Sequence, residues 1–219
     1  MRAAGQPIVA IPLGSCEQHG PHLPLDTDTR IAVVLADRLA VARPSVVVAP
    51  AVAYGASGEH AGFQGTLSIG LAALELVVVE LVRSADDFGG IVVVNGHGGN
   101  TEAVTRAVAT ARSERRRVMA WAPSSAAMGD DADAHAGRTE TSMLLALAPS
   151  TVQRERAEAG ATTPLATLLP ELRAGGVRAV SPNGVLGDPT GATATEGRTL
   201  LTALTDDLVD AFDRWRADW

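Results

Sequence analysis

Short, uninterrupted apolar runs recur along this chain, and each is followed by a segment whose apolar residues have helical spacing. Four such runs, at residues 8–13, 46–49, 91–94 and 118–122, alternate with helix-like segments at 28–39, 71–82, 101–112 and 139–147. Strands that alternate with helices of about ten residues predict an α/β fold with a mostly parallel central sheet flanked by helices. The runs at 46–48 and 91–94 contain only valine and isoleucine, which predicts strands buried on both faces.

The remainder of the chain gives no sign of a second domain. Residues 181–194 are rich in Gly, Pro and Thr and predict an ordered loop, and residues 195–215 have the spacing of a final amphipathic helix. There is no internal repeat, low-complexity tract or linker. With 219 residues, 46% of them apolar, the chain can bury an ordinary core, so we predict one layered domain over residues 1–219.

The charge pattern argues against several classes of protein. The net charge is −7, and the one basic run, Arg115 to Arg117, is typical of a solvated helix end rather than of a nucleic-acid site. The single cysteine, Cys16, excludes an intrachain disulfide, and no apolar run reaches the roughly 18 residues needed to span a bilayer. We therefore expect a soluble, cytoplasmic protein that binds neither nucleic acid nor membrane.

Histidines and carboxylates follow each of the four predicted strands. Ligands of open parallel sheets bind beyond the carboxyl ends of the strands, so these side chains should gather on one rim. One histidine in a loop is usually a surface or capping residue, but all five histidines of the chain fall on this rim. Imidazoles mixed with carboxylates suit Zn²⁺, Mn²⁺ or Fe²⁺ better than Ca²⁺ or Mg²⁺. In chain order the rim holds Glu17, His19, His22, Asp26 and Asp28, then Glu59 and His60, then His97, and finally Asp130, Asp131, Asp133, His135 and Glu140.

The spacing within this set adds detail. Glu17 and His19 are two residues apart and point to the same side of an extended segment. Asp28 begins a predicted helix, where alone it would be read as an N-cap, although a carboxylate can also bridge two metal ions. The glycines around His97 allow close approach of the backbone to a ligand, and they lack the Gly-Lys-Ser/Thr ending of a phosphate-binding loop.

Three of these segments together resemble the creatininase family: residues 14–28, residues 95–100 and residues 135–142. The resemblance implies a layered α/β fold and hydrolysis of cyclic or linear C–N amide bonds at a centre of two divalent metal ions, Fe²⁺ or Zn²⁺ and also Mn²⁺. It implies that His135 transfers a proton, and that the metal ligands include Glu17, His19, Asp28 as the bridge, and His97.

Two departures from creatininase itself bear on the site and on the substrate. Creatininase has a ligand Glu two residues after the His of its Asn-Gly-His motif, where this chain has Gly99, so we predict Glu140 as the fifth ligand. Creatininase also has an aromatic residue just before the proton-transfer histidine, where this chain has Asp131 and Asp133. This second difference argues against creatinine as the substrate.

Within the family, residues 25–30 and 183–192 are most similar to the subgroup that matures mycofactocin, a redox cofactor made from a ribosomal peptide. That resemblance implies a metal-dependent peptidase that cuts the modified precursor peptide by attack of a metal-bound water. The cut would release the C-terminal Val–Tyr-derived unit. The resemblance also implies a homo-oligomer, a hexamer or an octamer.

Several alternatives remain open from the sequence. The chain could be another amidohydrolase of the family, either a deformylase acting on a ring-opened purine or pterin-like amide, or a cyclic-amide hydrolase. It could also be a metal-binding scaffold without catalysis. Cys16 lies inside the first motif and could act as a thiol nucleophile, although a small buried residue is the simpler interpretation. His22, Glu59 and His60 could orient ligands or substrate, or they could make structural hydrogen bonds only.

Overall fold

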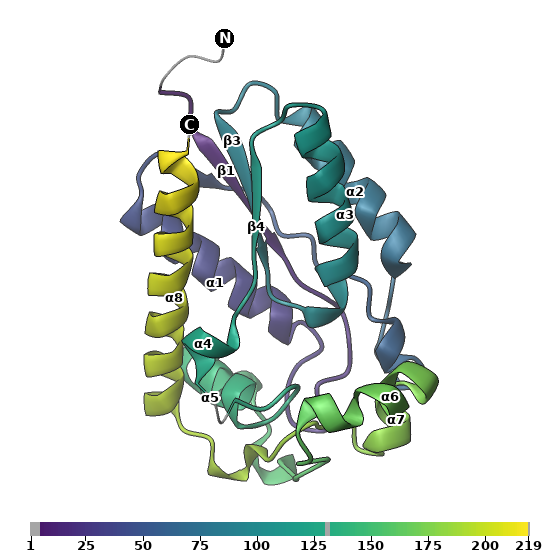
Figure 1. The fold of residues 1–219 in the computed structure, drawn as a ribbon. Coiled ribbons are helices and arrows are strands. Elements are labelled where there is room, and N and C mark those ends of the chain that lie inside the picture. The colour runs from purple at the N-terminus through teal and green to yellow at the C-terminus, as the bar shows by residue number, and fades with distance from the viewer. Residues whose placement is uncertain (1–4, 130–131, 219) are drawn as a thin grey trace.

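A four-stranded, fully parallel sheet forms the centre of the molecule (Figure 1). The computed structural model describes residues 5–129 and 132–218. The strand order is β2-β1-β3-β4, and the predicted α/β fold with its flanked parallel sheet is confirmed. The strands are β1 (Ile8–Leu13), β2 (Val46–Val48), β3 (Gly90–Asn95) and β4 (Val118–Trp121).

Helices cover both faces of the sheet, because alternate strand residues point to opposite sides. Ile8 and Ala10 of β1 belong to the core under α1, α5 and α8, whereas Val9 and Ile11 belong to the core under α2 and α3. In Figure 1 α8 runs along one side of the sheet and α2 and α3 run along the other. The bounds are α1 (Thr27–Ala42), α2 (Gly70–Ser84), α3 (Thr101–Ser113), α5 (Arg138–Leu147) and α8 (Ala194–Ala217).

The two valine-rich strands differ in their burial. Every residue of β3 is buried, as predicted. β2 pairs with β1 alone at the edge of the sheet, and Val47 is 43% exposed, so the prediction of a strand buried on both faces is wrong for β2. An apolar run records that a strand is hydrophobic, but not whether a neighbour covers its outer side.

Some helical segments were not predicted. The longest, α6 (Leu165–Gly175), contains Pro170 and has no buried residue. With α7 it lies at the end of the molecule where the strands end, away from the last turn of α8 (Figure 1). The loop at 181–194 is ordered as expected, since Leu186 pairs with His135 by backbone hydrogen bonds. The other short helical elements are α4 (Ser125–Met128), α7 (Val177–Val180), η1 (Gly58–His60), η2 (Gly98–Asn100), η3 (Pro149–Thr151), η4 (Arg154–Arg156) and η5 (Pro189–Gly191).

The sheet extends from β1 in both directions: β2 lies on one side of β1, and β3 and then β4 lie on the other. The chain leaves β1 through α1 to β2 on one side, then crosses through α2 to β3 on the other side. The loops that follow β1 and β3 therefore diverge, which leaves a crevice at the carboxyl ends of these strands where a ligand can bind.

Within the described part of the chain, no helix has both the length and the apolar character needed to cross a membrane.

Candidate metal centre

The crevice between the ends of β1 and β3 brings together the residues predicted as metal ligands. Glu17 and His19 come from the loop after β1, and Asp28 lies in the first turn of α1. His97 follows β3 directly. None of these four side chains is more than 6% exposed, so they form one buried polar cluster inside an otherwise apolar fold.

Asp28 is the centre of this cluster. Its Oδ1 lies 3.1 Å from His19 Nε2, and its Oδ2 lies 3.1 Å from His97 Nδ1. Ser15 Oγ also donates a hydrogen bond of 2.8 Å to Oδ2. The capping interpretation does not apply to Asp28, because Asp26 occupies the position before the helix and pairs with Arg30 at the surface. Two oxygens that face two different imidazoles are the arrangement a bridging carboxylate needs.

Glu17 is fully buried, and neither of its carboxylate oxygens accepts a hydrogen bond. Its nearest charged neighbours are His97 Nε2 at 3.1 Å and His60 Nε2 at 3.4 Å. Burial, together with the negative charge of Asp28, raises the pKa of Glu17 to about 7. A buried carboxylate without donors is costly, and a divalent cation would supply the missing partner. The residues present therefore fit a metal ion on the evidence of this orphaned carboxylate and of the mixed donor set.

Two more of the predicted residues reach the cluster from α5 and from the segment just before it. Glu140, in the first turn of α5, places Oε2 at 3.8 Å from His19 Nε2 and accepts a hydrogen bond from the backbone N–H of Ala136. His135 precedes α5, and its ring centroid lies 4.4 Å from that of His19. Three compact groups could each hold an ion among the described residues: Glu17 with His19 and Asp28, His19 with His135 and Glu140, and Glu17 with His60 and His135.

The ring nitrogens of His135 face different groups. Nε2 lies 2.9 Å from the main-chain oxygen of Gln18, which can only accept, so Nε2 carries a hydrogen there. Nδ1 is left free and lies 3.7 Å from Glu17 Oε1, on the side of the cluster. Burial and the charges of His19 and His60 hold the pKa of His135 well below its ordinary value. The ring is therefore neutral at pH 7 and can accept a proton.

Without a metal ion, other groups of the cluster hold their protons more tightly than usual, because their pKa values are raised. Burial opposes the charged form of His19, but the Asp28 carboxylate outweighs it and raises the pKa of His19 to about 10. For His97, contacts with Asp28 and Glu59 likewise outweigh burial and raise the pKa well above its ordinary value. Burial raises the pKa of Glu140 to about 7. A divalent ion that binds here must displace protons, so its affinity depends on pH.

The sequence reasoning did not single out Gln18, although it lies between two predicted ligands. Its side-chain Nε2 lies 2.9 Å from His60 Nδ1 and donates to the main-chain oxygen of Gly184 at 3.0 Å. Its main-chain oxygen accepts the hydrogen bond from His135 Nε2. Gln18 thus orients two histidines and anchors the 181–194 loop. Its only sequence signal is an amide placed inside the first motif.

The remaining rim residues have separate positions. His22 is buried and hydrogen-bonds through Nε2 to Thr141 Oγ1 at 2.8 Å, which ties the first motif to α5. Asp133 accepts a hydrogen bond from the backbone N–H of Thr139 and caps the start of α5. Cys16 Sγ lies 3.6 Å from the main-chain oxygen of Gly65. Asp130 and Asp131 lie outside the described residues.

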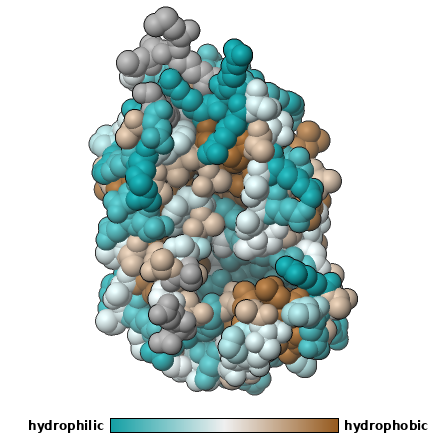
Figure 2. All heavy atoms as spheres, in the orientation of Figure 1, coloured by the Kyte–Doolittle hydropathy of each residue, from teal (hydrophilic) through white to brown (hydrophobic). Residues whose placement is uncertain are grey.

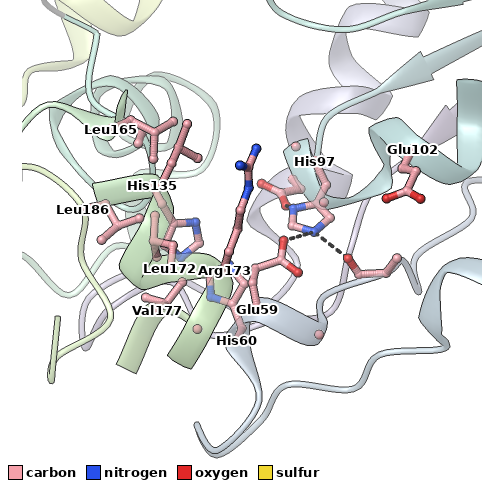
Figure 3. A pocket seen from close by; sticks show the side chains of 18 of the residues that line it. Glu59, His60, His97, Glu102, His135, Leu165, Leu172, Arg173, Val177 and Leu186 are labelled. Atoms are coloured by element: carbon pink, nitrogen blue, oxygen red, sulfur yellow. Dashed lines mark hydrogen bonds and ion pairs between the residues drawn. The ribbon is translucent and has the colours of Figure 1, made fainter. Parts of the chain in front are cut away.

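A cavity of about 870 Å³ opens onto the cluster, and its two walls differ (Figure 3). One wall carries acidic and imidazole groups, and the other is apolar and comes mainly from α6. Arg173 of α6 is the one arginine among the described lining residues, and its side chain extends between the walls in Figure 3. In Figure 2, brown side chains gather at the lower right, where Figure 1 draws α6 and α7. The polar wall includes Asp28, Glu59, His60, His97, His135 and Glu140, and the apolar wall includes Leu165, Leu169, Leu172, Val177 and Leu186.

Comparison with known proteins agrees with this fold and site. The model of the creatininase protein family, described as creatinine amidohydrolase, matches residues 1–212 of this chain. The mycofactocin precursor peptide peptidase of Mycolicibacterium smegmatis is 54% identical over 218 residues, which cover 97% of this chain and 87% of that protein. The creatinine amidohydrolase of Pseudomonas putida is 27% identical over 239 residues, which cover 95% of this chain and 90% of that protein.

Solved structures extend the comparison. A crystal structure of creatininase superposes with a TM-score of 0.81 at 25% identity, covering 96% of this chain and 90% of that one. A manganese form and a zinc–zinc variant of creatininase share the fold at a TM-score of 0.80 and 24% identity. This chain belongs to the creatininase family. It is therefore a hydrolase that acts on C–N bonds, in a family that includes metal-bound members.

Proposed function

We propose that this protein is a metal-dependent peptidase that hydrolyses the modified mycofactocin precursor peptide and releases its C-terminal Val–Tyr-derived unit. The observation that carries the proposal is the identity of 54% with the M. smegmatis peptidase over nearly the whole chain. The orphaned carboxylate of Glu17 is buried beside three imidazoles that line a large cavity, and this arrangement supports a hydrolytic metal site.

Two divalent ions would be held by opposite ends of the cluster. Glu17 and His97 would bind one ion, His19 and Glu140 would bind the other, and Asp28 would bridge them. The bridging role is supported by the two Asp28 oxygens, each 3.1 Å from a different histidine. The donor set of two imidazoles and three carboxylates is suited to Fe²⁺ or Zn²⁺, and Mn²⁺ is the third candidate.

When bound, the ions would lower the pKa of water and polarise the scissile carbonyl. His135 would act on the proton: its free Nδ1 faces the cluster, and its Nε2–H is held by the carbonyl of Gln18. It takes the proton that water releases as the new C–O bond forms, and it returns that proton to the leaving nitrogen as the C–N bond breaks. The lowered pKa leaves the ring neutral, so Nδ1 has a lone pair to accept the proton, and it makes the protonated ring a good donor to the leaving nitrogen.

The second wall of the cavity would receive the substrate. Leu165 and Leu172 of α6 lie across the cavity from the metal cluster (Figure 3), and Leu169 of the same helix also lines the cavity. Valine-derived and tyrosine-derived groups next to the scissile amide are apolar and would pack on these leucines, which excludes water from the reacting bond. A cavity of about 870 Å³ can enclose such a unit.

The wider organisation follows from the same observations. We infer that residues 1–219 form one domain, since one sheet carries the described elements on both its faces. We also infer a cytoplasmic homo-oligomer, a hexamer or an octamer. Exposed apolar side chains such as Val41, 84% exposed, and Leu76, 59% exposed, offer area for subunit contacts. The net charge of −7 argues against nucleic acid as a partner.

The direct test is incubation of the protein with the modified precursor peptide after loading with Fe²⁺, Zn²⁺ or Mn²⁺, followed by mass analysis. We expect release of the C-terminal unit and no change without metal. Parallel reactions with creatinine and with a formylated aminopyrimidine examine the other family activities. Turnover of either of these compounds with none of the peptide would replace the proposal with that activity.

A further inference from the structure

The two ring nitrogens of His97 have different surroundings. Nδ1 lies 3.1 Å from Asp28 Oδ2, inside the metal cluster. Nε2 lies 3.1 Å from Glu17 Oε2 without a hydrogen bond to it. Its hydrogen bond goes to the main-chain oxygen of Ala56 at 3.3 Å, and Ser57 Oγ lies at 3.5 Å. A carbonyl oxygen can only accept, so Nε2 carries the hydrogen and Nδ1 keeps the lone pair. The metal-binding nitrogen of His97 is therefore Nδ1.

A carboxylate from another loop also reaches Nε2. Glu59, on the η1 turn after β2, places Oε1 at 3.4 Å from His97 Nε2 (Figure 3). Its loop is held in position, because Asn100 Oδ1 accepts a hydrogen bond from the Ala56 N–H at 2.8 Å. Glu59 therefore approaches His97 from the side opposite Asp28.

Gly99 makes this approach sterically possible. A Cβ atom at this position would lie 2.5 Å from the Ala56 oxygen and 2.5 Å from His97 Nε2, and it would collide with Glu59 Oε1. Any side chain at 99 would thus displace the Ala56 oxygen and the Glu59 carboxylate, two of the oxygens around Nε2. The glycine is explained by the space that the Glu59 loop occupies against His97.

We propose that Glu59 is a positioning residue for the metal centre. Its carboxylate acts as an acceptor for the Nε2–H of His97, fixes the ring, and holds Nδ1 towards the ion that Asp28 also faces. A carboxylate paired with the second nitrogen of a metal-binding histidine sets the tautomer and strengthens the ligand. The inference rests on the proposed metal centre and adds a role that lies outside the ligand set.

Metal affinity measures this role without substrate. The metal-free full-length protein would be titrated with Zn²⁺ in competition with a chromogenic chelator, and with Co²⁺ by visible absorption. We expect Glu59→Ala to lower the binding affinity for one of the two ions by roughly 10–100-fold and to alter the Co²⁺ spectrum of that site. The affinity for the other ion should stay normal. Glu59→Gln keeps an acceptor for Nε2–H and should lose less.

The matched control is Glu102→Ala. Glu102 lines the same cavity but pairs with Arg106, so its removal should leave both affinities unchanged. Far-UV circular dichroism of the metal-free variants checks the fold. Unchanged affinities in a folded Glu59→Ala protein, or equal losses in Glu59→Ala and Glu102→Ala, would overturn the inference. A wild-type protein that binds neither Zn²⁺ nor Co²⁺ would instead refute the proposed metal centre itself.

Discussion

The two walls of the catalytic cavity are built in different ways. The polar wall, called the metal wall from here on, consists mainly of buried side chains, since four of its six named residues are at most 7% exposed. Side-chain hydrogen bonds made by Ser15, Gln18 and Asn100 connect its loops. The opposite wall is α6, which has no buried residue and contacts mainly α7 and the η1 turn. Leu165 and Leu169 are 44% and 37% exposed.

We infer from this contrast that the metal wall carries out the reaction and that the α6 wall selects the substrate. Reacting groups must be held within a fraction of an ångström, so they sit at the ends of the central strands. A wall that only accommodates side chains can be a lightly packed helix, which opens locally at low cost and tolerates change. Substitutions on the first wall should therefore affect metal content and kcat, and substitutions on the second should affect KM.

The largest effect is expected for Glu17→Gln. The change removes the charge that faces His97 and His60 but keeps the shape, so it should lower the content of the ion beside His97 and reduce hydrolysis on the order of 10³-fold. Elemental analysis and peptide hydrolysis measure both quantities, with Glu102→Gln as the control. A folded Glu17→Gln protein with full metal content and full activity would show that the metal wall does not take part in the hydrolysis.

His135→Gln should separate proton transfer from metal binding. Glutamine can still donate to the Gln18 carbonyl, but it cannot carry a proton between water and the leaving amine. We expect kcat to fall about 10²–10⁴-fold while both ions remain bound. Loss of an ion in this variant would instead make His135 a ligand, which two of the compact groups in the cluster would permit.

Leu169→Asp examines the opposite wall. A charge placed among the leucines of α6 should raise KM for the peptide at least about tenfold and leave kcat nearly unchanged, because Leu169 lines the cavity on the wall opposite the metal cluster. The free energy of unfolding should change by no more than about 0.5 kcal/mol, since the residue is 37% exposed. Ala109→Asp, on an exposed position of α3 outside the cavity, is the control. A fall in kcat with unchanged KM would contradict the division between the walls.

The same contrast explains what the sequence could predict. Glu17, His19, Asp28 and His97 follow strands or begin a helix, so the periodic pattern located them before any contact was known. Helix α6 escaped prediction because Pro170 interrupts its pattern and its leucines line a cavity rather than the core. The contact between Glu59 and His97 also escaped, because it depends on how the loop after β2 folds against Gly99. Long-range loop packing leaves no periodic trace in a sequence.

A smaller effect is expected in the stability of the metal-free protein at alkaline pH. The folded-state pKa of His19 is about 10, above its ordinary value, so the stabilisation by Asp28 is complete below about pH 6.5 and is lost as pH rises towards 10. His97 shifts in the same direction. Glu17 and Glu140, with pKa values of about 7, complete their ionisation before most of this window.

A bound metal ion replaces these protons, so the metal-loaded protein should not share the loss. Thermal unfolding followed by circular dichroism at pH 7, 8 and 9, with and without metal, measures the difference. The gap in melting temperature between the two forms should widen as pH rises. A gap that narrows over this range would show that the cluster does not hold its protons as the geometry of Asp28 requires.

The smallest effect is expected for Cys16→Ala, although Cys16 adjoins Glu17 in the sequence. Its Sγ lies 3.6 Å from the main-chain oxygen of Gly65, and the side chain is not among the described residues that line the cavity. Hydrolysis and metal content should therefore equal those of the wild-type protein within error. Loss of hydrolysis with both ions retained would instead support a thiol nucleophile. Adjacent positions in one loop would then differ sharply in role, because neighbouring side chains of an extended segment point to opposite sides.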